Sequence, residues 1–413
     1  MAPPGKLSVL SFEDWQYLSL IRSKNKMLYF DHCSSTPPHP DVVRTLSEVM
    51  LKHYANPASI HQMGMEADKL IQRARQLAAE LYATRAEEWI FTSGGTESNN
   101  LAVKGIARSY RHRGNHLITT GIEHPSVYEA FKALEEEGYE VTYLPAEADG
   151  RVSTGKLAAA LTDRTILVSV MHVNNETGAI QPIAEIGRLL SAYPKILFHV
   201  DGVQAAGKLE TDLKGWGVDL YSISAHKLQG PKGSGWLYAR EGLMLSPVLS
   251  GGGQERGLRS GTPNVPGIIA SAKALRMAVQ TASERRERML ELRSRLTAGL
   301  AGIPQLLIHG TDGSEGTMAP HIVCCSLPGL KPEVIVHSLE QEGIIISTKS
   351  ACSSRKDQPS RVLLAMGCTH EVAVSSLRIS LGDEHTKQDI DRLIERLSMI
   401  AAKLEPLAAR RQL

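Results

Sequence analysis

The chain has 413 residues, of which 42% are hydrophobic, 22% charged and 5% aromatic, and this composition is typical of a globular protein rather than of a disordered or collagenous chain. The formal net charge of +2 argues against the broad basic surface of a nucleic-acid binder and favours small-molecule partners. No apolar stretch approaches the roughly 18 residues that cross a bilayer, and Glu13 and Asp14 interrupt any signal-peptide core, so we expect a cytoplasmic protein with no membrane segment.

Residues 1–26 have a mixed pattern, which we treat as an N-terminal extension. From Met27 onward, short apolar runs alternate with longer amphipathic segments. This alternation predicts an α/β domain over residues 27–265, with a mostly parallel sheet covered by helices on both faces. The predicted strands are Met27–Phe30, Trp89–Thr92, His116–Thr120, Glu140–Leu144, Thr165–His172, Ile196–Val200 and Leu220–Ser224. The predicted helices include Asn99–Arg111, Pro125–Glu137, Thr154–Ala160, Ile183–Ala192 and Gly202–Gly207.

The composition of the sequence changes after Thr262. Val265 to Gly302 is rich in Ala, Leu, Arg and Glu at helical spacing, which indicates one long helix joining two lobes. Residues 266–413 are therefore predicted to form a smaller α+β domain. Its strands are His321–Leu327, Ile344–Ser347 and Leu377–Ser380, and its helices are Pro332–Glu342 and Thr386–Leu404.

Ligands of an open α/β sheet bind at the carboxyl ends of its strands, so the residues that follow each apolar run are candidates for a site. The strand in F-T-S-G-G-T-E-S-N-N (Phe91 to Asn100) runs into Gly95 and Thr96 before a helix begins. Glycines let the backbone approach an anion, and a helix N-terminus supplies amide donors and a favourable dipole. The segment is also compatible with a simple turn capped by threonine.

Two further strand ends add charged groups. Asp201 ends the run F-H-V-D, where a buried carboxylate needs a partner, and Lys227 follows the strand S-I-S-A-H-K. Each motif alone is compatible with an ordinary structural role. A cationic ring nitrogen facing Asp201, an aldehyde captured by Lys227 and a phosphate held at Thr96 together describe pyridoxal phosphate.

Seven blocks in the same order from about Met27 to Leu404 carry a closer resemblance. They are F-T-S-G-G-T-E-S-N-N, G-I-E-H, M-H-V-N-N-E-T-G, H-V-D-G-V-Q, S-A-H-K-L-Q-G-P-K-G, G-G-G-Q-E-R-G-L-R-S-G-T and S-A-C-S-S. The chain closely resembles the cysteine desulfurase branch of the class V aminotransferase-like proteins. The resemblance implies pyridoxal-phosphate fold type I, with a mostly parallel seven-stranded sheet, and a homodimer.

The resemblance also implies a role for individual residues. Lys227 would hold the cofactor covalently and move protons, Asp201 would face the pyridine nitrogen, and His124 would stack on the ring as a possible acid or base. The other expected cofactor contacts are Gln204 and Asn175 at the ring, Gly95, Thr96, Ser224 and His226 at the phosphate, and Thr262 reaching over from a partner subunit.

Two residues are expected to bind the substrate. Arg378 resembles the arginine that grips the substrate carboxylate, a task that suits the two parallel donors of a guanidinium, and Asn56 is its expected helper. No metal site is predicted, because Cys33 beside His32 supplies too few ligands.

One of the five cysteines stands out. The number is odd and there is no C-x-x-C pair, so a disulfide framework is not expected. Cys352 lies in a polar, cationic segment that favours a reactive thiolate, whereas Cys324, Cys325 and Cys368 lie in contexts typical of packing residues.

The resemblance implies sulfur removal from L-cysteine, with alanine as product and a persulfide on Cys352 for transfer to an acceptor such as an iron–sulfur scaffold or a transfer-RNA thiolation enzyme. Three alternatives stay open: a selenocysteine lyase, a plain aminotransferase, and a catalytically degenerate cofactor-binding scaffold. Two departures from the family pattern bear on substrate preference and on the acceptor. The opening motif reads D-H-C-S-S-T at Asp31 to Thr36, and Lys349 replaces a glycine.

Overall fold

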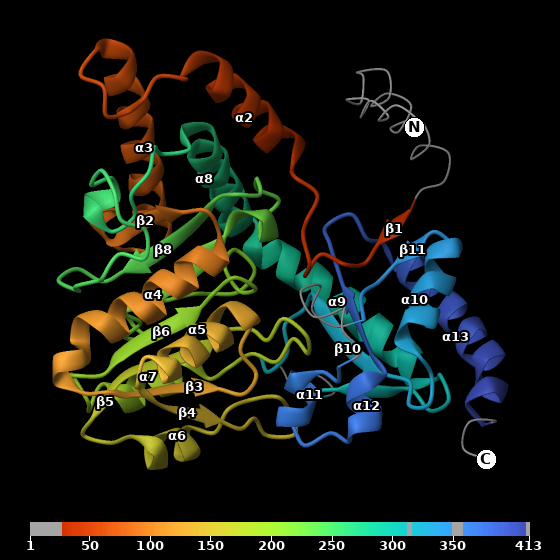
Figure 1. Cartoon of the computed structure of the whole chain (residues 1–413). Coiled ribbons are helices and arrows are strands. Elements are labelled where there is room, and N and C mark those ends of the chain that lie inside the picture. The colour runs from red at the N-terminus through yellow and green to blue at the C-terminus, as the bar shows by residue number, and fades with distance from the viewer. Residues whose placement is uncertain (1–26, 312–315, 349–357, 410–413) are drawn as a thin grey trace, which may run out of the picture.

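The chain folds into two lobes, seen on the left and right of Figure 1. The computed structural model describes residues 27–311, 316–348 and 358–409, and it is the structure discussed below. The larger lobe surrounds a seven-stranded sheet, and the smaller lobe contains a three-stranded sheet and a two-stranded one. Within the described ranges, no helix is long and apolar enough to cross a membrane.

The seven-stranded sheet has the strand order β2-β8-β7-β6-β5-β3-β4. Its strands are β2 (Trp89–Thr92), β3 (His116–Thr120), β4 (Glu140–Leu144), β5 (Thr165–Met171), β6 (Leu197–Asp201), β7 (Leu220–Ser224) and β8 (Gly235–Ala239). β8 pairs antiparallel with β2 and β7, and the other neighbouring strands are parallel. The predicted α/β fold with a mostly parallel seven-stranded sheet is confirmed; the sequence analysis assigned no strand to β8.

Both faces of this sheet are buried, because successive side chains of a strand point to opposite sides. In β3, Leu117 packs with α4 (Gly95–Tyr110) and α5 (Pro125–Glu136), whereas its neighbour Ile118 packs in the core on the other face. That second core contains residues of α3 (Gln62–Leu81), α6 (Thr154–Ala160), α7 (Ile183–Leu190) and α8 (Val265–Gln280). The helices α3 and α2 (Pro40–Lys52) lie where the sequence analysis assigned no element.

The predicted helix Gly202–Gly207 is wrong, because the chain makes consecutive turns there. Asp201 accepts a hydrogen bond from Val203 N, which fixes a turn at the end of β6. Gly202 packs so closely on the ring of Tyr221 that a Cβ would lie 2.0 Å from Cζ. Gly207 has φ +64, a conformation that ends a helix rather than continues it.

The predicted long helix between the lobes is divided at Thr281 into α8 and α9 (Ala282–Ala301). Thr281 has φ −105 and its hydroxyl donates to Met277 O. Residues of α8 belong to a core of the large lobe, and Leu292, Leu296 and Leu300 of α9 to the core of the small lobe. The segment thus passes from the hydrophobic core of the large lobe to that of the small lobe. The domain limits at residue 265 stay a prediction.

The small lobe contains an antiparallel sheet in the order β12-β10-β9, formed by β12 (Ser376–Ser380), β10 (Ile322–Ser326) and β9 (Leu307–His309). β1 (Leu28–Tyr29) pairs in parallel with β11 (Ile344–Ile345) and so does not join the large sheet. The helices of this lobe are α10 (Pro332–Gln341), α11 (Arg361–Ala365), α12 (His370–Val374) and α13 (Lys387–Ala409). The segment after β1 runs back to the large lobe, where Thr36 N donates to His226 O.

Candidate active site

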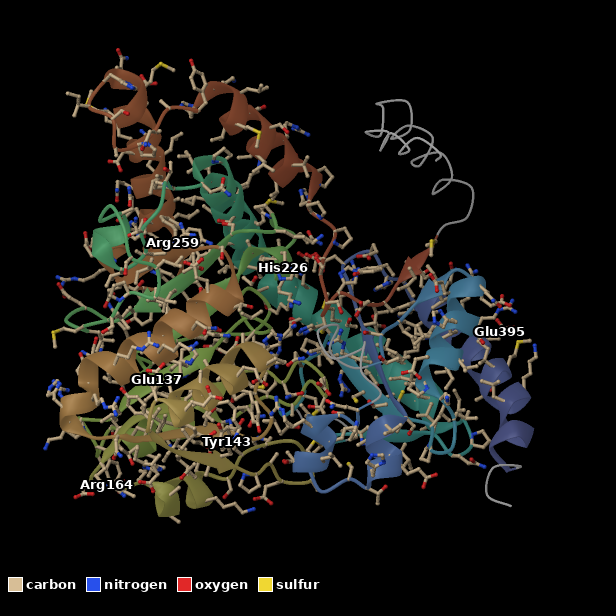
Figure 2. All side chains as sticks on the ribbon, in the orientation of Figure 1. Glu137, Tyr143, Arg164, His226, Arg259 and Glu395 are labelled. Atoms are coloured by element: carbon tan, nitrogen blue, oxygen red, sulfur yellow. The ribbon has the colours of Figure 1, made fainter. Side chains whose placement is uncertain are left out.

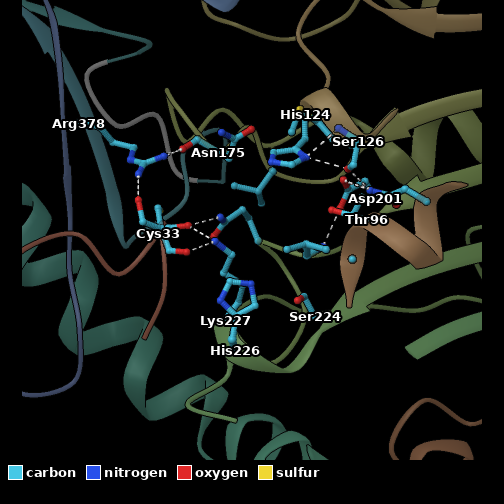
Figure 3. A pocket seen from close by; sticks show the side chains of 17 residues that line it. Cys33, Thr96, His124, Ser126, Asn175, Asp201, Ser224, His226, Lys227 and Arg378 are labelled. Atoms are coloured by element: carbon cyan, nitrogen blue, oxygen red, sulfur yellow. Dashed lines mark hydrogen bonds between the residues drawn. The ribbon is translucent and has the colours of Figure 1, made fainter. Parts of the chain in front are cut away.

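A cavity of about 180 Å³ lies where the carboxyl ends of β5, β6 and β7 meet the first turns of α4 and α5 (Figure 3). The segment after β1 and the strand β12 of the small lobe complete its wall. Figure 2 places His226, one of its lining residues, near the middle of the molecule. The cavity brings together ten of the predicted site residues: Gly95, Thr96, His124, Asn175, Asp201, Gln204, Ser224, His226, Lys227 and Arg378.

One end of the cavity is built to approach an anion. The 16-residue helix α4 begins at Gly95, so its first amides and the positive end of its dipole face the cavity. A Cβ on Gly95 would lie 2.7 Å from Val203 Cγ2, so only glycine fits there without a shift of its neighbour. A Cβ on Gly94 would lie 3.6 Å from Ser224 Oγ, which adds a hydroxyl beside the same turn.

Asp201 supplies a buried carboxylate to the cavity wall, on the side of Thr96 and Ser126 (Figure 3). Its side chain accepts from Val203 N at 3.0 Å and from Asn99 Nδ2 at 2.8 Å. Burial raises the pKa of this carboxyl, and its hydrogen bonds and Lys227 oppose the rise. Asn99 also donates to Ser126 Oγ at 2.8 Å, and its own Oδ1 is buried without a partner among the described residues. The carboxylate is thus held in one orientation.

His124 is the N-cap of α5. Its Nδ1 accepts from Ser126 N at 3.1 Å, so the proton of the neutral imidazole lies on Nε2. Burial, together with the positive charge of Lys227, lowers the pKa of His124 to about 4. The ring is therefore neutral at pH 7, with one N–H available as a donor.

Lys227 follows β7 in the short helix η3 (Ala225–Lys227). Its Nζ donates to Ser34 O at 2.8 Å and to Cys33 O. Burial lowers the pKa of the amine to about 8, so a substantial fraction is neutral near physiological pH. A neutral amine is the form that attacks a carbonyl carbon.

Arg378 forms the wall opposite to α4 and is only 2% exposed. Its guanidinium donates to Asp31 Oδ1 at 2.9 Å, to Ser34 Oγ at 2.7 Å and to Asn175 O at 2.9 Å. The remaining predicted ring contact, Gln204, donates from Nε2 to Cys33 O at 3.1 Å.

A second carboxyl lies close to Asp201. Glu123 is buried; it accepts from Thr120 Oγ1 at 2.8 Å and from Met171 N at 2.9 Å. Burial raises its pKa to about 8, and the negative charge of Asp201 adds to the rise. Glu123 is therefore largely protonated at pH 7.

Two of the predicted site residues within the described ranges are not brought together with the others, and a third lies outside those ranges. Asn56 and Thr262 are exposed and do not line the cavity. The side chain of Asn56 instead accepts from Ala58 N at 3.0 Å, in the connection between α2 and α3 at the outer tip of the large lobe (Figure 1). Cys352 lies outside the described residues. The roles of all three stay predictions.

The structure also adds residues that the sequence analysis did not select. Asn99 lies four residues after Gly95, hence on the same face of α4, and Ser126 lies two residues after His124. These two spacings in the sequence indicate that Asn99 and Ser126 lie near the predicted site residues. Asp31, Cys33 and Ser34 belong to the unusual D-H-C-S-S-T motif, but nothing local in that motif indicates a contact with Arg378 or Lys227.

The chain is similar to known proteins over most of its length. The model of the family described as Aminotransferase class-V matches residues 28–393. The chain is 44% identical over 369 residues to the "NifS/IcsS protein homolog" of Lactobacillus delbrueckii subsp. bulgaricus, covering 89% of this chain and 95% of that protein. It is 41% identical to "Cysteine desulfurase IscS" of Methanosarcina thermophila, covering 94% of this chain and 95% of that protein.

Solved structures of similar fold and sequence are also found. One titled "NIFS-LIKE PROTEIN" matches with a TM-score of 0.85 and 36% identity, covering 92% of this chain and 100% of the other. Another, titled "SspA in complex with cysteine", matches with a TM-score of 0.73 and 32% identity, covering 86% of this chain and 98% of the other.

Proposed function

Since the chain belongs to the class V aminotransferase family, we propose that it is a cysteine desulfurase, which takes sulfur from L-cysteine and releases L-alanine. The observation that carries the proposal is the placement of Lys227, Asp201 and Arg378 around one cavity. An amine, a buried carboxylate and a guanidinium are the groups that a pyridoxal-phosphate enzyme acting on an α-amino acid requires.

The donor set of the cavity fits pyridoxal phosphate. The first turn of α4, with Gly95, Thr96 and Ser224, would hold the phosphate, and Asp201 would pair with the protonated ring nitrogen. The buried Oδ1 of Asn99, which lacks a donor within the described residues, is a further polar atom beside Asp201. When bound, the cofactor supplies an electron sink that weakens the bonds at Cα and Cβ of the substrate.

The chain's own residues then bind the substrate and move its protons. Arg378 would bind the α-carboxylate, and Lys227 would carry a proton at Nζ to and from the substrate. The lowered pKa of Lys227, about 8, suits an amine that must both give and accept a proton. His124 lies over the same cavity and offers its Nε2 proton to the reacting groups.

Cys352 is the proposed sulfur acceptor. Its thiolate forms an S–S bond with the substrate sulfur while the Cβ–S bond breaks, and the electron pair of that bond stays with the carbon fragment, which is protonated and leaves as alanine. The enzyme retains a persulfide on Cys352. A sulfur-acceptor protein, such as an iron–sulfur scaffold or a transfer-RNA thiolation enzyme, would remove it by thiol exchange.

We also propose that the enzyme acts as a homodimer in the cytoplasm. The α2–α3 region exposes large apolar side chains, among them Leu51 at 77% and Ile60 at 95%, and a partner subunit would cover them. Asn56 and Thr262, which lie outside their own cavity, would then contribute to the cavity of the partner. The described cysteines are free thiols, which supports a reducing compartment.

The test is turnover of L-cysteine by the purified holoenzyme, with alanine and protein persulfide measured together. We expect equal amounts of both in a single turnover, and with Cys352→Ser we expect bound cofactor but no persulfide. The 2-oxo acid 3-mercaptopyruvate in place of alanine would favour an aminotransferase, and turnover of L-selenocysteine alone would favour a selenocysteine lyase. No product from either amino acid would identify a degenerate scaffold.

A further inference from the structure

Three hydrogen bonds fix the orientation of the Arg378 guanidinium. A guanidinium has five N–H donors, and three of those on Arg378 are engaged: one NH1 proton with Asn175 O and both NH2 protons with Asp31 and Ser34. Ser34 Oγ in turn donates to Asp31 Oδ1 at 2.8 Å, so the three side chains form a closed triangle of hydrogen bonds. The Nε donor is buried and has no acceptor among the described residues.

The segment that supplies Asp31 and Ser34 is itself fixed to the strand that carries Arg378. Asp31 forms a parallel bridge with Ser380, which lies two residues after Arg378 on the same face of β12. Cys33 N donates to Ser380 Oγ at 2.9 Å, and His32 Nε2 lies 2.7 Å from Glu384 Oε1. Asp31 therefore faces Arg378 from a rigid position.

The same segment reaches the other end of the substrate site. The carbonyl oxygens of Cys33 and Ser34 accept from Lys227 Nζ, while the hydroxyl of Ser34 accepts from Arg378. Ser34 thus lies between the group that binds the substrate carboxylate and the lysine whose place the substrate amine takes. The distance between these two groups is set by one short piece of chain.

We propose that Asp31 is a positioning residue for recognition of the substrate α-carboxylate, and that it acts by holding Arg378 through the Asp31–Ser34–Arg378 triangle. Asp31 and Ser34 fix the guanidinium plane by accepting from both NH2 protons. The pairing also neutralises Arg378, whose charge is buried and needs a permanent anion when no substrate is bound. The inference rests on the proposed function, because it concerns the same cavity and the same carboxylate.

The proposal makes a specific prediction about binding rather than chemistry. Removing the charge of Asp31 frees Arg378 to reorient, so a ligand with a carboxylate loses affinity and a ligand without one does not. A charge-assisted hydrogen bond contributes about 1.5–3 kcal/mol, which corresponds to a loss of about 10–100-fold. Ser34→Ala removes a hydroxyl that accepts from Arg378 and donates to Asp31, but it leaves the charge of Asp31 in place, so it should cost about 3–10-fold.

The experiment compares the holoenzymes of wild type, Asp31→Asn, Asp31→Glu and Ser34→Ala. The readouts are KM and kcat for L-cysteine, and the inhibition constants of L-alanine and of ethylamine, which is alanine without its carboxylate. We expect Asp31→Asn to raise KM and the L-alanine constant by about 10–100-fold, with kcat and the ethylamine constant within about threefold of wild type. Asp31→Glu, which keeps the charge, should lie closer to wild type.

Asp391→Asn is the matched control, because Asp391 pairs with Arg295 at 2.5 Å on the surface of the same lobe, with both side chains 48% exposed. This variant should leave every constant unchanged. Equal weakening of L-alanine and ethylamine in Asp31→Asn, or unchanged constants in both Asp31→Asn and Ser34→Ala, would overturn the role of Asp31. A wild-type enzyme that makes no alanine from L-cysteine would instead refute the proposed function.

Discussion

Replacement of Asp201 by asparagine is the sharpest perturbation of the proposed electron sink. The amide keeps the shape of the side chain but removes the charge that would stabilise a protonated ring nitrogen. It also has one oxygen where the carboxylate has two acceptors, so either Val203 N or Asn99 Nδ2 loses its partner. That loss costs about 1–3 kcal/mol of folding stability. Relief from burying an ionised carboxylate offsets part of it.

The effect on catalysis should be larger than the effect on folding. Removing one preorganised electrostatic contact typically lowers kcat by about 10²–10³, or about 2.7–4 kcal/mol, and we expect this loss for Asp201→Asn. The assay is alanine formation from L-cysteine at saturating substrate, normalised to bound cofactor, beside a thermal unfolding curve. Cofactor should remain bound, because Lys227 and the first turn of α4 are unchanged.

Asp219→Asn is the control for a buried aspartate outside the cavity. Asp219 accepts from Phe198 N at 2.8 Å and pairs with Arg240 at 2.6 Å. We expect this variant to lose stability and to keep kcat per bound cofactor within about threefold of wild type. If Asp201→Asn also kept its kcat within that range, the assignment of Asp201 to the ring nitrogen would be refuted.

Three further predictions follow from burial and packing in the cavity. Glu123 has a pKa of about 8 in the folded chain, against an ordinary value of 4.5. Between these two pH values folding takes up a proton. The free energy of unfolding should therefore fall as pH rises from about 5 to 8. Glu123→Gln should remove this slope in melting curves at pH 5, 7 and 9, and an unchanged slope would show that Glu123 is not its source. Because the pKa of Lys227 is about 8, the rate at which pyridoxal phosphate reconstitutes the apoenzyme should be half-maximal near pH 8 and level off above about pH 9. A half-maximal rate only near pH 10 would contradict a lowered pKa. Gly95→Ala would put a Cβ 2.7 Å from Val203 Cγ2. The dissociation constant of the cofactor, measured by absorbance titration, should therefore rise by about 10-fold or more. Wild-type affinity in this variant would show that the close packing at Gly95 is not needed for cofactor binding.

Much of the sheet of the large lobe could be predicted from sequence because strands such as β2, β5 and β6 are largely apolar runs that are buried along their whole length. The predicted strands from Trp89 to Ser224 agree with the structure to within one residue at each end. β8 was not predicted, since it follows a turn rich in Gly and Pro and joins the sheet only through antiparallel pairing with β2 and β7. The break at Thr281 was missed because helical composition continues through it.

The cavity was predictable to the extent that its residues follow strand ends. Gly95, Asp201 and Lys227 each come directly after an apolar run, and parallel strands bring such positions to one edge of the sheet. Asp31 and Arg378 are 347 residues apart, and their contact depends on the bridge between Asp31, which follows β1, and Ser380 of β12. Neither composition nor local spacing contains that information.

The most direct test of the account is to locate the cofactor on the chain. The protein is loaded with pyridoxal phosphate, reduced with borohydride, digested and mapped by mass spectrometry. The account predicts a single modified peptide, with the pyridoxyl group on Lys227, and none in Lys227→Ala. Modification of a different lysine, or no modification of the loaded protein, would contradict it.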